Sequence, residues 1–276
     1  TIGTAEADGS VGGVSQVRLD AVGYAVKTAG TSCFMTEQTY AFIDDLTRRA
    51  RALGMEVLVE IHSHFRNQVQ VASRVDRVYD FALPPLLLHA LHTGDARPLV
   101  RWIRLRPTNA VTVLDTHDGI GVIDVGRDQD SGEEGLLTDA QVDALIESIH
   151  VASGGQSRQA TGWAASNVDV YQVNCTYLDA LGGDDEAYMV ARTVQLMLPG
   201  IPQIYYVGLL GAHNDMELLA RTGVGRDINR HRFTPAEVGD ALDRPGSLTR
   251  RQLDLVELRA THPAFDGHFA VEARDE

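Results

Sequence analysis

The feature that most constrains this chain is a set of short apolar runs that end on acidic residues. They are Val17-Arg18-Leu19-Asp20, Val57-Leu58-Val59-Glu60 and Val113-Leu114-Asp115-Thr116-His117-Asp118. β-Branched runs of this length are typical of buried strands in a parallel sheet. In an α/β barrel, functional residues at the carboxyl ends of such strands gather on one face. The pattern therefore predicts that Asp20, Glu60 and Asp118 lie together.

Strand-like and helix-like segments alternate along most of the chain, which implies a parallel sheet with right-handed crossovers. Polar residues at several strand ends favour a barrel over a doubly wound sheet. Because five strands cannot close an eight-stranded barrel, the expected fold is α/β, part of a (β/α)8 TIM barrel with about its last five strands, in a piece of a longer chain. Strands are expected at 14–20, 55–60, 75–81, 110–115 and 201–207, and helices at 37–53, 68–73, 84–93, 185–198, 234–242 and 247–260.

The stretch between the fourth and fifth expected strands is too long for a simple crossover. Its Gly-, Asp- and Ser-rich part predicts a small inserted subdomain, and the Gly-rich opening, 1–13, is expected to lack regular structure. The predicted divisions are a first part of the barrel at 1–119, the subdomain at 120–183, the last part of the barrel at 184–262, and the start of a C-terminal β-domain at 263–276.

Composition excludes several classes of function. The net charge of −14 argues against a nucleic-acid partner and an anionic membrane surface. No apolar stretch approaches the roughly 18 residues that a membrane span needs. Cys33 and Cys175 are too few and too far apart for a disulfide framework, so a cytoplasmic location is expected.

No cluster has the spacing of a metal site, and the expectation is that the protein binds no metal. His89 and His92 lie one turn apart on an apolar helix and are expected to pack rather than bind zinc. Asp124, Asp128 and Asp130 lack the spacing of a calcium loop and are expected to be solvated.

Paired carboxylates at strand ends are typical of retaining glycoside chemistry, in which one acts as nucleophile and the other as acid and base. Asp20 is the expected nucleophile, because Arg18 lies on the same face of the strand and can keep it ionised. Glu60 ends an apolar run, which favours a raised pKa and the role of acid/base. Asp118 would stabilise the transition state, with His117 beside it on the sugar hydroxyls. Any one of these acids alone could instead be a surface cap or a loop ion pair.

The same residues resemble signature regions of the α-amylase superfamily. The matching stretches are Val17–Tyr24, Glu60–Ser63 and Leu114–Gly121, and a narrower likeness to the sucrose phosphorylases is carried by Ala29–Thr36, Val78–Ala90 and Gly225–His231. The resemblance implies a disaccharide phosphorylase that converts sucrose and inorganic phosphate to α-glucose 1-phosphate and fructose through a β-glucosyl-aspartate. It implies no cofactor, since phosphate is a co-substrate. Because the family includes dimers, a homodimer is one alternative for the assembled state.

The resemblance also assigns residues to substrate binding. Asp169-Val170-Tyr171-Gln172 looks like the loop that shapes the acceptor site, and Arg226 has a counterpart at the donor sugar. His62, two residues after Glu60, would reach the acceptor, and Arg18 and Leu19 would flank the nucleophile. Each residue also has a purely structural alternative. Tyr171 could fill the core, His62 could be a structural histidine, and Arg226 could pair with Asp215 or Asp227.

Several functions remain open at this point. The catalytic acids do not separate a phosphorylase from an amylase-like α-glucosidase. A phosphorylase of sucrose 6-phosphate or of glucosylglycerate-type glucosides would need added cations near Tyr171, and only Arg158 is a candidate. A rival of another class is an inactive truncated piece.

Overall fold

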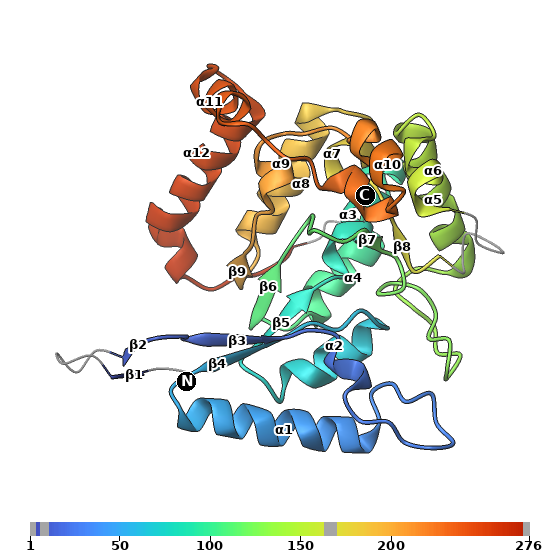
Figure 1. Cartoon of the computed structure of the whole chain (residues 1–276), viewed down its shortest axis with the longest axis vertical. Coiled ribbons are helices and arrows are strands. Elements are labelled where there is room, and N and C mark those ends of the chain that lie inside the picture. The colour runs from blue at the N-terminus through green and yellow to red at the C-terminus, as the bar shows by residue number, and fades with distance from the viewer. Residues whose placement is uncertain (1–3, 6–10, 163–169, 273–276) are drawn as a thin grey trace.

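The computed structural model describes residues 4–5, 11–162 and 170–272, in which short strands alternate with helices (Figure 1). Its strands are β1 (Thr4–Ala5), β2 (Val11–Gly12), β3 (Gln16–Leu19), β4 (Glu56–Val59), β5 (Arg77–Asp80), β6 (Ala110–Thr112), β7 (Ile120–Gly121), β8 (Gln172–Val173) and β9 (Ile201–Pro202). Its α-helices are α1 (Glu37–Ala52), α2 (Phe65–Ala72), α3 (Leu83–Thr93), α4 (Arg97–Leu105), α5 (Asp139–Ala152), α6 (Gln156–Thr161), α7 (Tyr177–Ala180), α8 (Asp185–Met197), α9 (Tyr206–Leu209), α10 (Met216–Thr222), α11 (Pro235–Asp243) and α12 (Leu248–Thr261). The 3-10 helices are η1 (Val22–Tyr24), η3 (Gly225–Asn229) and η4 (Pro263–Asp266).

A five-stranded parallel sheet positions the site. Its order is β3-β4-β5-β6-β9, so β3 and β9 form the two edges. The register pairs Leu19 with Val59 and Asp80 with Thr112, which brings the carboxyl ends of the strands to one side. The predicted α/β class and the parallel sheet are confirmed.

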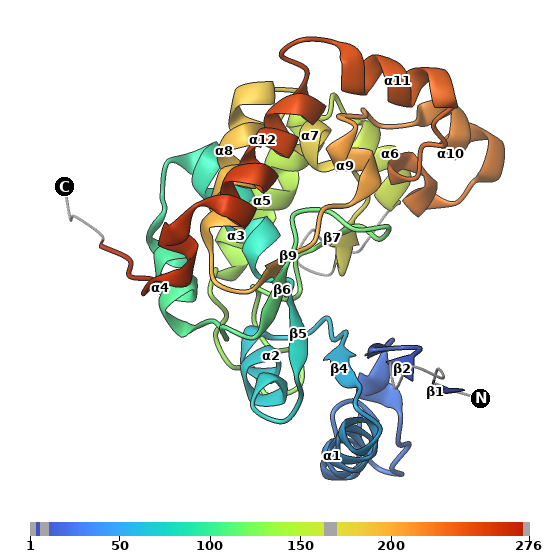
Figure 2. The ribbon, with the colours of Figure 1, turned by 90° about the vertical axis from the view of Figure 1, so that its left-hand side faces the viewer.

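Helices α1 and α2 pack against strands β4 and β5 of this sheet. Helix α1 begins at the Thr36 cap, whose side chain accepts a hydrogen bond from Thr39 N, and it packs against β4. Figure 2 shows this N-terminal part to one side, while the helices from α5 to α12 gather at the other end of the molecule. Short β-branched strands that pack under helices bury the apolar runs of the sequence.

Two buried clusters make most of the core. One lies under β4 and β5 and includes Ile43, Val57 and Val71. The larger one surrounds α3, whose leucines contact α4, α5 and α8. Among the described residues, every helix is too short or too polar to cross a bilayer.

The fifth strand is shorter than predicted. Residues 201–207 were expected to be one strand, but β9 stops at Pro202 and α9 begins at Tyr206. Proline has no N–H for the ladder, which limits the pairing of a strand at that point. The opening residues were expected to lack structure, yet β1 and β2 pair antiparallel.

Within 120–183 the described residues form the β7–β8 ribbon and the helices α5, α6 and α7. Helix α5 was not predicted, although Thr138 and Gln141 form a capping box at its start. That signal was available in the sequence. The limits of the predicted subdomain remain a prediction.

Candidate active site

The acidic residues singled out in the sequence follow the carboxyl ends of three strands of the same parallel sheet, β3, β4 and β6. Asp20 follows β3 and Glu60 follows β4, and Glu60 N donates a hydrogen bond to Leu19 O at 3.0 Å. Asp118 lies in the loop after β6. One side-chain atom each of Glu60, His62 and Asp118 falls within 4.8 Å of the others. The sheet therefore brings these acids together.

Arg18 joins the first two acids. Its guanidinium contacts Glu60 directly and lies 3.7 Å from an Asp20 oxygen. The sequence led to the expectation that Arg18 would serve Asp20, but the closer contact is with Glu60. The Asp20 side chain is 73% exposed and that of Glu60 only 9%.

The environment of Glu60 suits an acid that keeps its proton near neutral pH. Burial, helped by the neighbouring Asp20, raises the pKa of Glu60 to about 7. Arg18 and His62 act in the opposite direction without overcoming the effect of burial. A carboxylic acid with such a pKa can donate a proton to a leaving group.

Asp118 is held by arginines from the far end of the chain. Arg226, in η3, donates to Asp118 Oδ1 at 2.8 Å, and Arg230 lies 3.6 Å from the same oxygen. The alternative partners expected for Arg226 pair with other residues: Asp215 binds His231, and Asp227 lies near Arg230. The structure thus places Arg226 at the site.

His62 is buried between an aromatic ring and a carboxylate. Its ring stacks on Phe81 with centroids 3.7 Å apart, and its Nδ1 lies 2.9 Å from Asp124 Oδ2. Burial lowers the pKa of His62, but Asp124 more than offsets this, so the pKa is raised. The expectation that Asp124 is a solvated loop residue was wrong, because it is fully buried. Its partners come from segments distant in sequence, which no local spacing reveals.

The expected acceptor segment is described only in part, because Asp169 lies outside the described residues. Tyr171 is 46% exposed, and its hydroxyl donates to His62 O at 3.4 Å. Burial of the hydroxyl raises the pKa of Tyr171. Gln172 is buried in β8 opposite Gly121, while Val170 packs against the larger core cluster. Tyr171 therefore lies at the site and not in the core.

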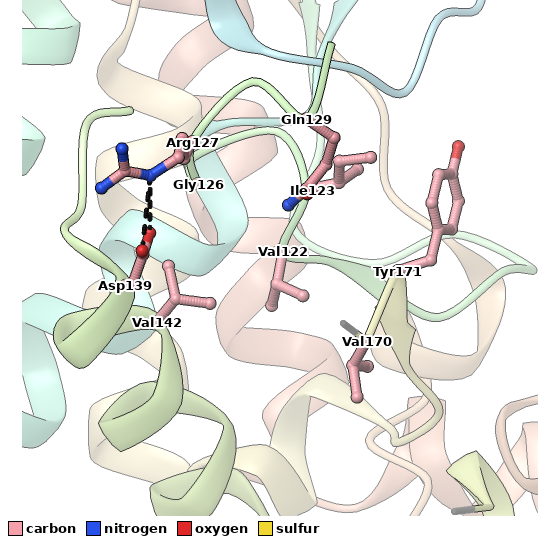
Figure 3. A pocket seen from close by; sticks show the side chains of 9 residues that line it. All are labelled: Val122, Ile123, Gly126, Arg127, Gln129, Asp139, Val142, Val170 and Tyr171. Carbon is pink, nitrogen blue, oxygen red and sulfur yellow. Dashed lines mark hydrogen bonds and ion pairs between the residues drawn. The ribbon is translucent and has the colours of Figure 1, made fainter. Parts of the chain in front are cut away.

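A pocket of about 270 Å³ lies beside this segment (Figure 3). Val170 and Tyr171 form one wall, and Val122 and Val142 contribute apolar side chains. Its only cationic lining side chain among the described residues, Arg127, is paired with Asp139 in α5 at 3.3 Å.

The remaining predicted residues flank this arrangement. The His117 side chain is 55% exposed and lies 3.8 Å from Asp118. Leu19 packs, partly buried, against the smaller core cluster. His89 is buried in α3, and His92 bonds to Ala180 O at 2.9 Å, in agreement with packing roles.

Glu60, His62 and Asp118 are the group of described residues that most resembles a metal site. Arg18 and Arg226 already bind its two carboxylates, and their charges oppose a divalent cation. The donor set fits a sugar or an anion better than a metal.

No protein-family model matches the chain. A sucrose phosphorylase of Agrobacterium vitis is 62% identical over 95% of this chain and 53% of that protein. One of Bifidobacterium adolescentis is 54% identical over 95% of this chain and 52% of that protein. The chain is homologous to about half of a sucrose phosphorylase. It spans about half the length of the curated relatives it matches.

Solved structures agree with the sucrose phosphorylase relationship. The sucrose 6F-phosphate phosphorylase of Thermoanaerobacter thermosaccharolyticum superposes with a TM-score of 0.84 at 38% identity, over 95% of this chain and 52% of that one. An α-amylase of H. orenii, at 15% identity and a TM-score of 0.53, shares the fold. The five parallel strands are therefore part of a (β/α)8 barrel, as predicted from the sequence.

Proposed function

We propose that this chain supplies the catalytic carboxylates of a sucrose phosphorylase. The observation that carries the proposal is the placement of Asp20, Glu60 and Asp118 at the same side of one parallel sheet, with Glu60 buried and its pKa raised to about 7. The 62% identity to a sucrose phosphorylase supports the substrate.

The proposed reaction has two displacements. An Asp20 oxygen attacks the anomeric carbon of the glucosyl unit, the bond to the fructosyl oxygen breaks, and Glu60 gives that oxygen its proton. A phosphate oxygen then attacks the same carbon, the bond to Asp20 breaks, and the proton of the attacking oxygen passes to Glu60. Two inversions give α-glucose 1-phosphate.

Asp118 and its arginines would act on the sugar during both steps. Asp118 accepts hydrogen bonds from Arg226, so its charge is held at a fixed place where positive charge develops on the ring. The reaction requires no metal or organic cofactor, because the two carboxylates supply the proton transfers and the covalent step. Phosphate is a co-substrate.

Acceptor binding is assigned to His62, Tyr171 and Gln172, and contact with sugar hydroxyls to Asp169. His62 lies in the cluster with Glu60, and the ring of Tyr171 meets the His62 ring edge-on, with centroids 5.9 Å apart. A homodimer and a cytoplasmic location remain predictions from the sequence.

The second candidate is a phosphorylase of a phosphorylated or glycerate-linked glucoside. Relatives named sucrose 6(F)-phosphate phosphorylase and glucosylglycerate phosphorylase are 40% and 30% identical. Such acceptors need a free cation, but Arg127 is paired with Asp139 and Arg158 with Glu147. These pairings favour sucrose.

The test uses the complete polypeptide that carries this sequence, incubated with sucrose with and without phosphate. We expect glucose 1-phosphate only when phosphate is present, and none from Asp20→Ala. Asp143→Asn, on the exposed side of α5, is the control and should retain activity. Free glucose at one rate with or without phosphate would indicate a hydrolase.

The inactive-piece alternative is tested on the chain itself. A folded domain of this size should unfold in a cooperative thermal transition. A broad, non-cooperative loss of ellipticity would favour that alternative.

A further inference from the structure

Asp124 is the most completely enclosed carboxylate near the candidate active site, and the proposed reaction has not used it. It is fully buried in the turn that follows β7. Its Oδ1 accepts hydrogen bonds from Ser63 N at 3.1 Å and from Gln68 Nε2 at 2.8 Å, and its Oδ2 faces His62 Nδ1 at 2.9 Å. Burying a carboxylate is costly, so these bonds fix its position.

The other nitrogen of His62 has no partner. His62 Nε2 is buried and makes no hydrogen bond to any described group. Because Asp124 occupies Nδ1, Nε2 is the nitrogen left to face the cluster with Glu60 and Asp118. An unpaired polar atom at such a place is available to a ligand.

The backbone leaves room for this pair. A Cβ atom at Gly121 would lie 2.4 Å from Asp124 Oδ2 and 3.0 Å from His62 Nδ1. Any side chain at that position would therefore push the carboxylate and the imidazole apart. Gly121 pairs with Gln172 in the β7–β8 ribbon. The ribbon residue that lies against Asp124 and His62 is therefore the one that has no side chain.

We propose that Asp124 is a positioning residue that orients His62, so that Nε2 is the contact for the incoming acceptor, phosphate in particular. This inference rests on the proposed function and extends it to a residue outside the carboxylate trio.

A carboxylate on Nδ1 fixes the ring orientation and places a proton on that nitrogen. It also stabilises the imidazolium, whose Nε2–H is a donor to an anion. The charged and titratable groups around His62 are Asp124, Glu60, Asp118 and Tyr171, with Arg18 behind Glu60.

Asp124→Asn removes this effect with little change of shape. The amide oxygen can still accept from Ser63 N and Gln68 Nε2, while the amide NH₂ faces His62 Nδ1. Neutral His62 must then carry its proton on Nε2, and the imidazolium loses its counter-charge. We expect the KM for phosphate to rise roughly 10-fold, the lower end of the effect seen when a carboxylate that orients a metal-bound histidine is lost. Hydrolysis of sucrose without phosphate should fall by a smaller factor than phosphorolysis does.

Two further variants sharpen the test. Gly121→Ala should reproduce the phosphate defect with both members of the pair present. Asp143→Asn makes the same change of side chain on the exposed side of α5, so its KM for phosphate should remain within about twofold of the original.

A measurement independent of activity follows the imidazole itself. In the ¹⁵N-histidine spectrum, with His62 assigned by His62→Gln, neutral His62 should carry its proton on Nδ1. In Asp124→Asn the proton should move to Nε2.

The outcomes separate the two proposals. If the unsubstituted protein forms no glucose 1-phosphate, the proposed function fails and the acceptor role fails with it, whatever the spectrum shows. If it forms the product but Asp124→Asn keeps the original KM for phosphate, only the positioning role is overturned. A neutral His62 protonated on Nε2 in the unsubstituted protein would overturn it even if Asp124→Asn did not fold.

Discussion

Arg192 and Asp115 form an ion pair inside the fold, with Arg192 Nη2 3.2 Å from Asp115 Oδ1 and both side chains almost completely buried. Arg192 also donates to Gln252 Oε1 at 3.0 Å and contacts the Tyr188 hydroxyl. The pair links α8 to the end of β6 and to α12. Asp115 belongs to the same acidic run as Asp118 but serves the core.

Removing Arg192 should destabilise the protein strongly. Arg192→Leu leaves the buried carboxylate of Asp115 without its counter-charge, which typically costs about 3–5 kcal/mol. Urea unfolding should show this as a lower midpoint. Arg251→Leu, which breaks an exposed pair with Glu186, is the control and should cost no more than about 1 kcal/mol. Equal midpoints for the two variants would contradict the structural role of the pair.

A methyl group at Gly208 should also be harmful. The Cβ of Gly208→Ala would lie 1.7 Å from Asp115 Oδ2 and 2.5 Å from the Tyr188 hydroxyl. We expect destabilisation of about 1–3 kcal/mol from overpacking. Gly239→Ala, in α11, meets nothing within 4 Å and should stabilise by about 0.5–1 kcal/mol. Thermal melts of both variants check the opposite signs.

The first displacement should lose rate as the pH rises through about 7, because Glu60 must be protonated to donate. Arg18→Gln removes a charge that lowers the pKa of Glu60, so it should shift this loss of rate to higher pH. The measurement is kcat/KM for sucrose against pH. If kcat/KM fell at the same pH in both proteins, a group other than Glu60 would control the loss of rate.

The same raised pKa has a consequence for stability. The folded protein holds the Glu60 proton more tightly than the unfolded chain does, between the ordinary value of 4.5 and about 7. The stabilisation is fully present below 4.5 and is lost as the pH rises to about 7. Glu60→Gln should flatten this part of the curve of unfolding free energy against pH.

Arg226→Ala should impair catalysis more than folding. It removes a charged hydrogen bond to Asp118, worth about 1.5–3 kcal/mol, or roughly 10- to 100-fold in kcat/KM for sucrose. Arg104→Ala, exposed on α4, should have no effect. If both variants kept full activity, Arg226 would have no role in sugar binding.

Strand ends were predictable because apolar runs and terminal acids are local features. Asp20 and Glu60 could be placed from their own neighbours, since successive parallel strands of a sheet end on the same side. A capping box could also have revealed α5, since Thr138 and Gln141 are three residues apart.

Contacts between distant segments could not be read in this way. Arg226 and Asp118 are 108 residues apart, and His62 and Asp124 are 62 apart. The buried Asp124 binds Ser63 and Gln68, which are 61 and 56 residues away in the sequence and meet it only in the folded chain. Charge and spacing along the sequence therefore favoured a solvated loop, where packing produced a buried acid.

The position of Asp20 on an edge strand, three-quarters open to solvent, has a practical consequence. A glucosyl group on that carboxylate would stand at an open rim, where water competes with phosphate for the same carbon. A polypeptide that pairs with β3 would shield it. The ratio of glucose 1-phosphate to free glucose would report such pairing.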